Sequence, residues 1–184
     1  MIATPILFIS PVRAGKSTIA YLIASQLKFP HISLDELRWG YYNEIGYDDE
    51  LAKQIRAQGG FLALMFYRQL FDAHSVERVL SEYPEAVIDF GAGIGSFENQ
   101  EHMEHIHALF GPIPNIFLLL PSPDIEESLM ILRQRDVSPP VDLKFDINAH
   151  FLHHPGYRLL AKHIIYTNNK IPEQVCAEVV KLLH

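Results

Sequence analysis

The sequence predicts one three-layer α/β domain, in which a five-stranded parallel sheet is covered by helices on both faces. Short, almost wholly apolar segments alternate with stretches whose apolar residues recur at helical spacing, along the whole of residues 1–184. Apolar strands of this kind are typical of parallel sheets, because helices shield both faces of such sheets. The length fits a single domain, and no linker or internal repeat interrupts the alternation.

Five short segments are the predicted strands, and the fourth of them is the most apolar stretch in the chain. In sheets of this type ligands bind beyond the carboxyl ends of the strands, so the polar residues after each strand are candidate site residues. The predicted strands are residues 6–9, 31–34, 86–90, 116–120 and 164–166.

Helical periodicity fills the segments between the strands. A weak helix ends at Gly59-Gly60, and a long amphipathic helix with no internal glycine or proline follows it. The predicted helices are residues 19–27, 51–58, 61–82, 98–110 and 124–135, together with a closing helix that Pro172 opens.

Two helix starts carry capping signals, and one long loop separates the last helices. Ser33 and Glu36 are spaced as a capping box, while Ser122 and Pro123 form a suitable cap and first-turn pair. Residues 136–148 contain a Ser-Pro-Pro stretch and are predicted to form a mobile loop.

The composition argues against several classes of protein. The net charge is −7 and the 15 basic residues form no run, which argues against DNA or RNA as the main partner. No segment approaches the roughly 20 apolar residues of a membrane helix, and residues 2–9 lack the positive flank of a signal peptide. Cys176 is the only cysteine, which indicates a reducing compartment. The sequence therefore predicts a cytoplasmic protein that engages neither nucleic acid nor a membrane.

The loop after the first predicted strand has the features of a phosphate-binding loop. Between a strand and a helix, free backbone N–H groups and the positive end of the helix dipole favour an anion. Lys16 adds a charge that can follow the β- and γ-phosphates, and the Ser17 hydroxyl can hold Mg²⁺. The alternative is an ordinary strand-to-helix turn. The residues predicted to bind the phosphates of ATP are Arg13, Ala14, Gly15, Lys16, Ser17 and Thr18.

The loop departs from the full phosphate-loop pattern at two positions. The pattern has glycine where Ser10 stands, and many such loops also have glycine where Arg13 stands. Ser10 precedes a proline and should be extended, as the end of a strand would be. Arg13 either contacts phosphate or points into solvent.

In the order of these features the chain resembles the P-loop small-molecule kinases of the nucleoside and nucleotide kinase superfamily, and shikimate kinase most of all. The similarity covers almost the whole length, from the phosphate loop through an acidic second-strand end and a glycine-rich third-strand turn to the closing helix. It implies the three-layer fold of P-loop NTPases, with a lid over about residues 133–148. It also implies use of ATP and Mg²⁺, and transfer of the γ-phosphoryl group to a hydroxyl or phosphate of a small-molecule acceptor.

Two carboxylates are assigned by this resemblance. In shikimate kinases the second strand ends in an Asp-x-Asp pair, and the matching positions here are Ser33 and Asp35. The family implies that Asp35 faces the acceptor hydroxyl and orients it, whereas the first acidic residue, which orders Mg²⁺-bound water, is missing. Asp89 could replace it, since it ends a strand in the form of a Walker B site. The alternatives are a first-turn residue that satisfies the helix dipole for Asp35, and a strand-end turn residue for Asp89.

Other residues are assigned to the acceptor and the lid in the same way. Gly91 and Gly93 resemble the third-strand turn where substrate approaches backbone N–H groups, although a plain tight turn would need the same residues. Arg68 lies in the helix that supplies a substrate-binding arginine, but the surrounding pattern argues against shikimate, and an exposed helix arginine is the alternative. Arg133 and Arg135 resemble lid arginines that stabilise the moving phosphoryl group, or are cations at a helix C-terminus.

Aromatic and histidine residues are further candidates for contact with a ligand. Five aromatic side chains could line the acceptor pocket, although core packing explains them equally well: Tyr41, Tyr42, Tyr47, Phe66 and Tyr67. Two histidine groups, one around His102 and His105 and one around His150, are interpreted as polar faces, and no metal site is assigned to protein ligands.

Two further hypotheses belong to other functional classes. One is a nucleotide-binding regulatory or ATPase module that transfers no phosphate to a small acceptor, and the other is a scaffold that no longer binds nucleotide. The departures at Ser10, Arg13 and Ser33 leave both open.

Overall fold

The computed structural model describes residues 2–135 and 145–184 and is built on one five-stranded, entirely parallel sheet. The spatial order of the strands is β2-β3-β1-β4-β5. The five parallel strands predicted from the sequence are therefore confirmed. They are β1 (Ile6–Ile9), β2 (His31–Ser33), β3 (Val87–Asp89), β4 (Ile116–Leu120) and β5 (His163–Tyr166).

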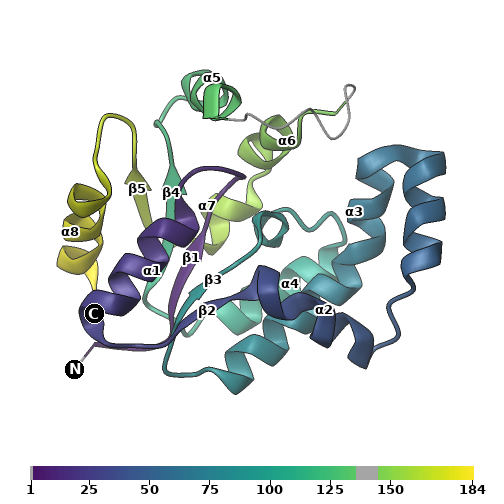
Figure 1. Cartoon of the computed structure of the whole chain (residues 1–184), viewed down its shortest axis with the longest axis horizontal. Coiled ribbons are helices and arrows are strands. Elements are labelled where there is room, and N and C mark those ends of the chain that lie inside the picture. Colours follow the sequence, from purple (N-terminus) through teal and green to yellow (C-terminus); the bar gives the residue numbers. More distant parts are fainter. Residues whose placement is uncertain (1, 136–144) are drawn as a thin grey trace.

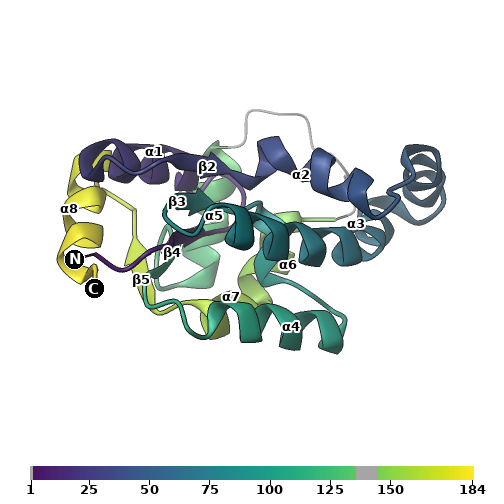
Figure 2. The same cartoon turned by 90° about the horizontal axis from the view of Figure 1, so that it is seen from below.

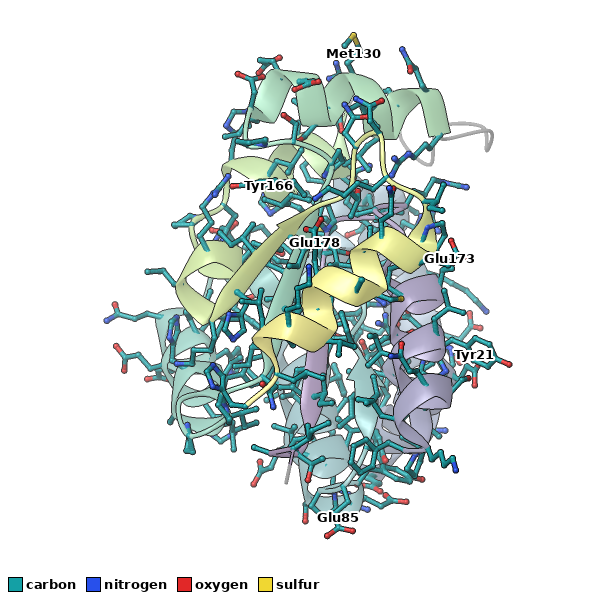
Figure 3. All side chains as sticks on the ribbon, turned by 90° about the vertical axis from the view of Figure 1, so that its left-hand side faces the viewer. Tyr21, Glu85, Met130, Tyr166, Glu173 and Glu178 are labelled. Atoms are coloured by element: carbon teal, nitrogen blue, oxygen red, sulfur yellow. The ribbon has the colours of Figure 1, made fainter. Side chains whose placement is uncertain are left out.

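Helices cover both faces of this sheet and make the three layers that the sequence predicts (Figures 1 and 2). Figure 3 looks onto α1 and α8, which lie side by side over one face, while α3, α4 and α7 pack on the other. The helical elements are α1 (Lys16–Leu27), α2 (Leu34–Glu44), α3 (Asp49–Glu82), the 3-10 turn η1 (Ala92–Gly95), α4 (Gln100–Phe110), α5 (Ile125–Arg135), α6 (Ile147–His153), α7 (Gly156–Leu160) and α8 (Pro172–Leu182).

The central strand explains why the strands read as continuous apolar runs. All four residues of β1 have no exposed surface. Ile6 and Phe8 point into the layer beneath α1 and α8, and Leu7 and Ile9 point into the opposite layer, because successive side chains of a strand alternate. Because both faces are buried, every residue of the strand has to be apolar, whichever face its side chain points to.

The helix α3 carries a sharp break where the sequence predicts a boundary. Gly60 has φ 72° and ψ −165°, a conformation outside the helical region that glycine adopts without a steric penalty. The ribbon bends at this point, as Figure 1 shows on the side of the molecule far from α8. The two predicted helices are thus the two arms of one element.

Three local predictions need correction or completion. Ser122 and Pro123 do not cap α5 directly, because the backbone N–H of Glu127 donates to Asp124 Oδ1 at 2.7 Å and the helix begins one residue later. The helices α6 and α7 were not predicted, since segments this short carry little periodicity. Most of the predicted loop 136–148 lies outside the described residues, and its last two residues belong to α6.

None of the helices within residues 2–135 and 145–184 combines the length and apolar character that crossing a bilayer would need.

Candidate functional site

The loop between β1 and α1 exposes a row of backbone donors. Arg13 and Gly15 both have left-handed backbones, with φ 65° and φ 94°, and the helix begins at Lys16 with no side-chain cap. The first bond of the helix runs from Ile19 N to Gly15 O, so the N–H groups of residues 16–18 have no acceptor within the helix. Alternating left-handed residues gather N–H groups into an anion-binding concavity. The loop, with Asp35 and Ala92, lines a cavity of about 310 Å³.

The side chain of Lys16 is directed at the end of β3. It is 8% exposed, and its Nζ donates to Asp89 Oδ1 at 3.1 Å and to Ser17 Oγ at 3.5 Å. The cation of the loop is therefore held by a carboxylate from a neighbouring strand, beside the hydroxyl predicted to hold Mg²⁺.

Asp89 is the centre of a buried polar network. Its side chain has no exposed surface, and besides Lys16 it receives Ser33 Oγ on Oδ1 and His31 Nε2 on Oδ2, each at 3.1 Å. Burial acts to raise the pKa of Asp89, but the charge of Lys16 and the hydrogen bonds from Lys16, Ser17 and His31 lower it below its usual value. Asp89 is therefore an ionised carboxylate at neutral pH.

The register of the sheet relates Asp89 to the missing acidic residue of β2. Ser33 is the residue of β2 that pairs with Asp89 of β3, so the Asp89 carboxylate lies beside the position where the Asp-x-Asp pair has its first carboxylate. In this chain the carboxylate at this place therefore comes from β3 and not from β2. The predicted capping box is wrong, because the Ser33 hydroxyl bonds to Asp89 and makes no cap bond to α2.

Asp35 stands in the first turn of α2 beside the loop after β3. Arg38, one helical turn later, donates from Nη2 to Asp35 Oδ1. A Cβ atom on Gly91 would overlap Arg38 Nη2 and would lie 2.7 Å from Asp35 Oδ1. Gly91 therefore leaves room for this ion pair of the protein itself, which is a more specific requirement than a tight turn.

A second cavity, of about 230 Å³, opens next to the phosphate loop. It shares Val12, Asp35 and Ala92 with the first cavity, and Arg68 and Gly93 also line it. The remaining lining residues are Arg38, Phe61, Met65, Gln69, Asp72, Ser96, Ile147 and Phe151.

The two predicted lid arginines point to different places. Arg133 donates from Nε and Nη2 to Asp146 Oδ2, at 2.9 and 2.6 Å, and so is directed at the start of α6. Arg135 donates from Nη1 to the backbone oxygen of Arg13 at 3.4 Å, and so lies on the phosphate loop. The rest of the predicted lid, residues 136–144, lies outside the described residues.

A third cavity, of about 170 Å³, lies beyond β5 and against the other side of the phosphate loop. Gly15 and Arg135 line it, together with Thr167 and Lys170 from the segment after β5. Thr167 Oγ1 is buried and has no hydrogen-bond partner among the described residues.

Several residues of the site were not found from the sequence. Arg38 and Asp72 line the second cavity, and His31 holds Asp89. Arg38 could have been found from its spacing, because a residue three positions after Asp35 lies on the same face of a helix. The contact of His31 with Asp89 depends on strand order, which the sequence does not state.

The aromatic residues considered for the acceptor pocket pack elsewhere. Tyr42, Tyr47 and Tyr67 stack with one another and with Phe71 between α2 and α3, and none of the five candidates lines the second cavity. The histidines make ordinary polar contacts, such as His105 with Glu77 at 3.4 Å. Among the described residues, no group of three histidine, cysteine or acidic residues could hold a metal.

Comparison with known proteins supports the fold class. No family model matches the chain, and no curated protein sequence is significantly similar to it. The strand order and the phosphate loop define a three-layer P-loop NTPase fold. Solved shikimate kinases share that fold over almost the whole chain, so this is a shikimate kinase-like structure.

Three of these structures have similar scores. Shikimate kinase from Acinetobacter baumannii in complex with shikimate has a TM-score of 0.60 at 17% identity, and the match covers 96% of this chain and 90% of that one. The enzymes from Bacteroides thetaiotaomicron and Aquifex aeolicus have TM-scores of 0.58 and 0.57 at 19% and 22% identity, with 96% of this chain and 94% of each of those covered. At such identities the likeness establishes the fold, and the site has to be argued from its own residues.

Proposed function

We propose that this protein is an ATP- and Mg²⁺-dependent phosphotransferase that moves the γ-phosphoryl group to a hydroxyl or phosphate of a small molecule. The observation that carries the proposal is the junction of two cavities at Asp35. One cavity is lined by the phosphate loop and the other by the helices α2 and α3, and Asp35 lines both. A carboxylate at such a junction is placed to meet the group that attacks the phosphate.

The loop and its neighbours fit a nucleoside triphosphate. The unpaired N–H groups at the start of α1 suit phosphate oxygens, and Lys16 supplies the positive charge. The third cavity, which Thr167 and Lys170 line on the far side of the loop, would hold the base.

The oxygen groups beside Lys16 fit Mg²⁺. Mg²⁺ prefers hydroxyl, carboxylate and water oxygens, and keeps several waters in its shell. Ser17 would bind the ion directly and the ionised Asp89 through water. When bound, Mg²⁺ neutralises charge on the β- and γ-phosphates.

The acceptor would lie in the second cavity, with its hydroxyl at Asp35. Asp35 orients that hydroxyl and takes its proton as the new O–P bond forms and the bond from the γ-phosphorus to the leaving ADP oxygen breaks. Arg38 fixes the carboxylate of Asp35, and Arg68 and the backbone at Gly93 contact the body of the acceptor. Arg135, already on the phosphate loop, is the arginine placed to stabilise charge on the transferred group.

Substitution of Asp35 tests this assignment. Asp35→Asn should leave Mg·ATP binding unchanged, because the carboxylate lies outside the loop backbone, and should lower transfer by roughly 10²- to 10⁴-fold. Binding is measured by calorimetry and transfer by ADP release with a panel of hydroxyl compounds. Glu36→Gln, the exposed neighbour on α2, is the matched control. Full transfer by Asp35→Asn would contradict the proposal.

A regulatory or ATPase module is the second candidate, and two positions of the sequence favour it. Arg13 stands where such loops often have glycine, and Ser33 stands where the first carboxylate of the kinase pair is found. This candidate predicts slow ATP hydrolysis that no hydroxyl compound accelerates and that Asp35→Asn leaves unchanged. Acceptor-dependent ADP release with stoichiometric phosphorylated product would exclude it.

A further inference from the structure

Two opposite charges line the second cavity without neutralising each other directly. Arg68 and Asp72 lie four residues apart on α3, a spacing at which side chains commonly pair. Arg68 instead donates from Nε to Tyr47 Oη at 3.1 Å, with its guanidinium 5.2 Å from the centre of the Trp39 ring. Asp72 Oδ1 instead accepts from Tyr42 Oη. Separate aromatic partners therefore hold the two charges apart at the cavity wall.

The lining of this cavity contains both hydrogen-bond donors and hydrogen-bond acceptors. Asp72 Oδ2 faces the η1 turn, 3.9 Å from where a Cβ of Gly93 would stand, and Gly93 lines the same cavity. Arg38 Nε is buried and has no hydrogen-bond partner among the described residues. The side chains of Arg38, Asp72 and Arg68 thus line one small cavity, and the lining includes both donor and acceptor groups.

The charges of the cavity lining also balance. Two aspartates and two arginines line it, and one pair, Asp35 with Arg38, is already joined. Burial raises the pKa of Asp72, while Arg38, the Tyr42 hydroxyl and Arg68 act to lower it. A hydrogen-bond donor on a ligand would therefore stabilise the ionised form of this carboxylate.

From these features, and resting on the function proposed above, we infer that the acceptor is an uncharged small polyol and that Asp72 selects against carboxylate-bearing acceptors. A hydroxyl both donates and accepts, so neighbouring hydroxyls satisfy Arg38, Asp72 and Arg68 together. A carboxylate only accepts and would meet the charge of Asp72, whereas an ammonium group only donates and would meet two arginines. The cavity of about 230 Å³ is smaller than the roughly 300–1,000 Å³ of sites for drug-sized ligands, which suits a molecule of monosaccharide or cyclitol size.

The apolar part of the lining agrees with a ring. Phe61, Met65 and Phe151 face the same cavity as the charged residues. The C–H face of a sugar or cyclitol ring can pack on such side chains while its hydroxyl edge meets the polar atoms.

The native protein tests the inference with matched compounds. Binding to the complex with Mg·ADP is measured by calorimetry for pairs that share a skeleton, such as glucose with glucuronate, galactose with galacturonate, and inositol with quinate, with glucosamine as the cationic member. In each pair that binds, the neutral member should bind at least about tenfold more tightly. Tighter binding of the acid or the amine overturns the inference, and so does a panel in which no neutral polyol binds.

Substitution of Asp72 then separates selection from folding. Asp72→Asn keeps an oxygen for Tyr42, and should weaken binding of the neutral member while narrowing its advantage over the acid by at least about tenfold. Asp72→Glu, which restores the charge, should recover the preference. Glu77→Gln is the matched control, since Glu77 lies on the exposed face of α3 and pairs with His105. An equal loss for both members of a pair in Asp72→Asn would show a structural role and overturn the inference.

These outcomes are distinguishable from failure of the proposed function. Binding is measured without turnover, so preferential polyol binding with no phosphorylated product would remove the kinase proposal and leave only the cavity's selection for a neutral polyol by Asp72. Efficient phosphorylation of a hydroxy acid would do the reverse.

Discussion

The two halves of the candidate site are built from different materials. On the phosphate side the groups come from strand ends and backbone, and the buried carboxylate of Asp89 has partners on both oxygens. On the acceptor side they come from side chains of α2 and α3, and a buried donor on Arg38 has no partner in the part of the chain that the structure describes. The first half is specified by the topology of the sheet, whereas the second is free to vary with the side chains that the helices carry.

The phosphate side should give the largest effect on activity. Lys16→Ala removes the side-chain charge that the proposal assigns to holding the β- and γ-phosphates, and should lower transfer by at least about 10³-fold. Transfer is followed by ADP release, with thermal unfolding to confirm that the variant folds. Lys53→Ala is the control, because Lys53 is exposed and pairs only with Glu50 on the surface of α3. Undiminished turnover in Lys16→Ala would contradict the assignment of the loop to phosphate binding.

The same side should also give the largest effect on stability. Asp89→Ala leaves the nearly buried Lys16 without its partner, and breaking a buried pair costs about 3–5 kcal/mol of unfolding free energy. Because the pKa of Asp89 is lowered in the folded state, its stabilisation is present above the unfolded pKa of about 4 and is lost as the pH falls below it. Urea unfolding at neutral and acid pH measures both effects. A difference that stays constant through the acid range would contradict the assignment.

Two glycines of the third-strand turn should differ on the acceptor side. A Cβ on Gly91 would displace the Arg38–Asp35 pair, so Gly91→Ala should lower transfer roughly 10- to 100-fold by moving the carboxylate. A Cβ on Gly93 would meet only Asp72 Oδ2 at 3.9 Å, so Gly93→Ala should change acceptor KM more than kcat. Steady-state kinetics separate the two parameters. Equal effects of the two substitutions would place Asp35 outside the reaction.

The smallest expected effect concerns Asp72 on the acceptor side, whose contribution to stability should change with pH in the direction opposite to that of Asp89. Burial raises the pKa of Asp72 despite the opposing charge of Arg38, so its contribution to stability is greatest below the unfolded pKa and is lost as the pH rises. Asp72→Asn should therefore gain stability relative to the native protein between about pH 4 and neutrality. Glu77→Gln should run parallel to the native protein. Parallel curves for Asp72→Asn would contradict the raised pKa.

The difference between the halves also explains what the sequence could predict. The strands follow from the apolar runs and their order. Lys16 follows from the loop between a strand and a helix, and Asp35 from its place just after the second strand. The contact of Asp89 with Ser33 needs the strand order, because the two residues are neighbours only when β2 and β3 pair.

Side-chain direction limited the rest of the prediction. Arg133 and Arg135 are two residues apart, so they point to opposite sides of α5, and sequence similarity could not separate them. Asp72 was missed because its place in the cavity depends on how α3 crosses the sheet. Its spacing from Arg68 was the one available signal, and that spacing more often marks a surface ion pair.

The ion pair between Lys16 and Asp89 affects how the binding of one ligand would change the affinity for the other. Because Asp89 already neutralises Lys16, a nucleotide that takes the lysine leaves a buried carboxylate uncompensated, and a cation at Ser17 and Asp89 removes that penalty. In the function proposed above, each ligand would therefore make the other's site more favourable, which is positive thermodynamic coupling and is reciprocal. Cooperativity between metal and nucleotide would then arise from the Lys16–Asp89 ion pair alone and would need no conformational change.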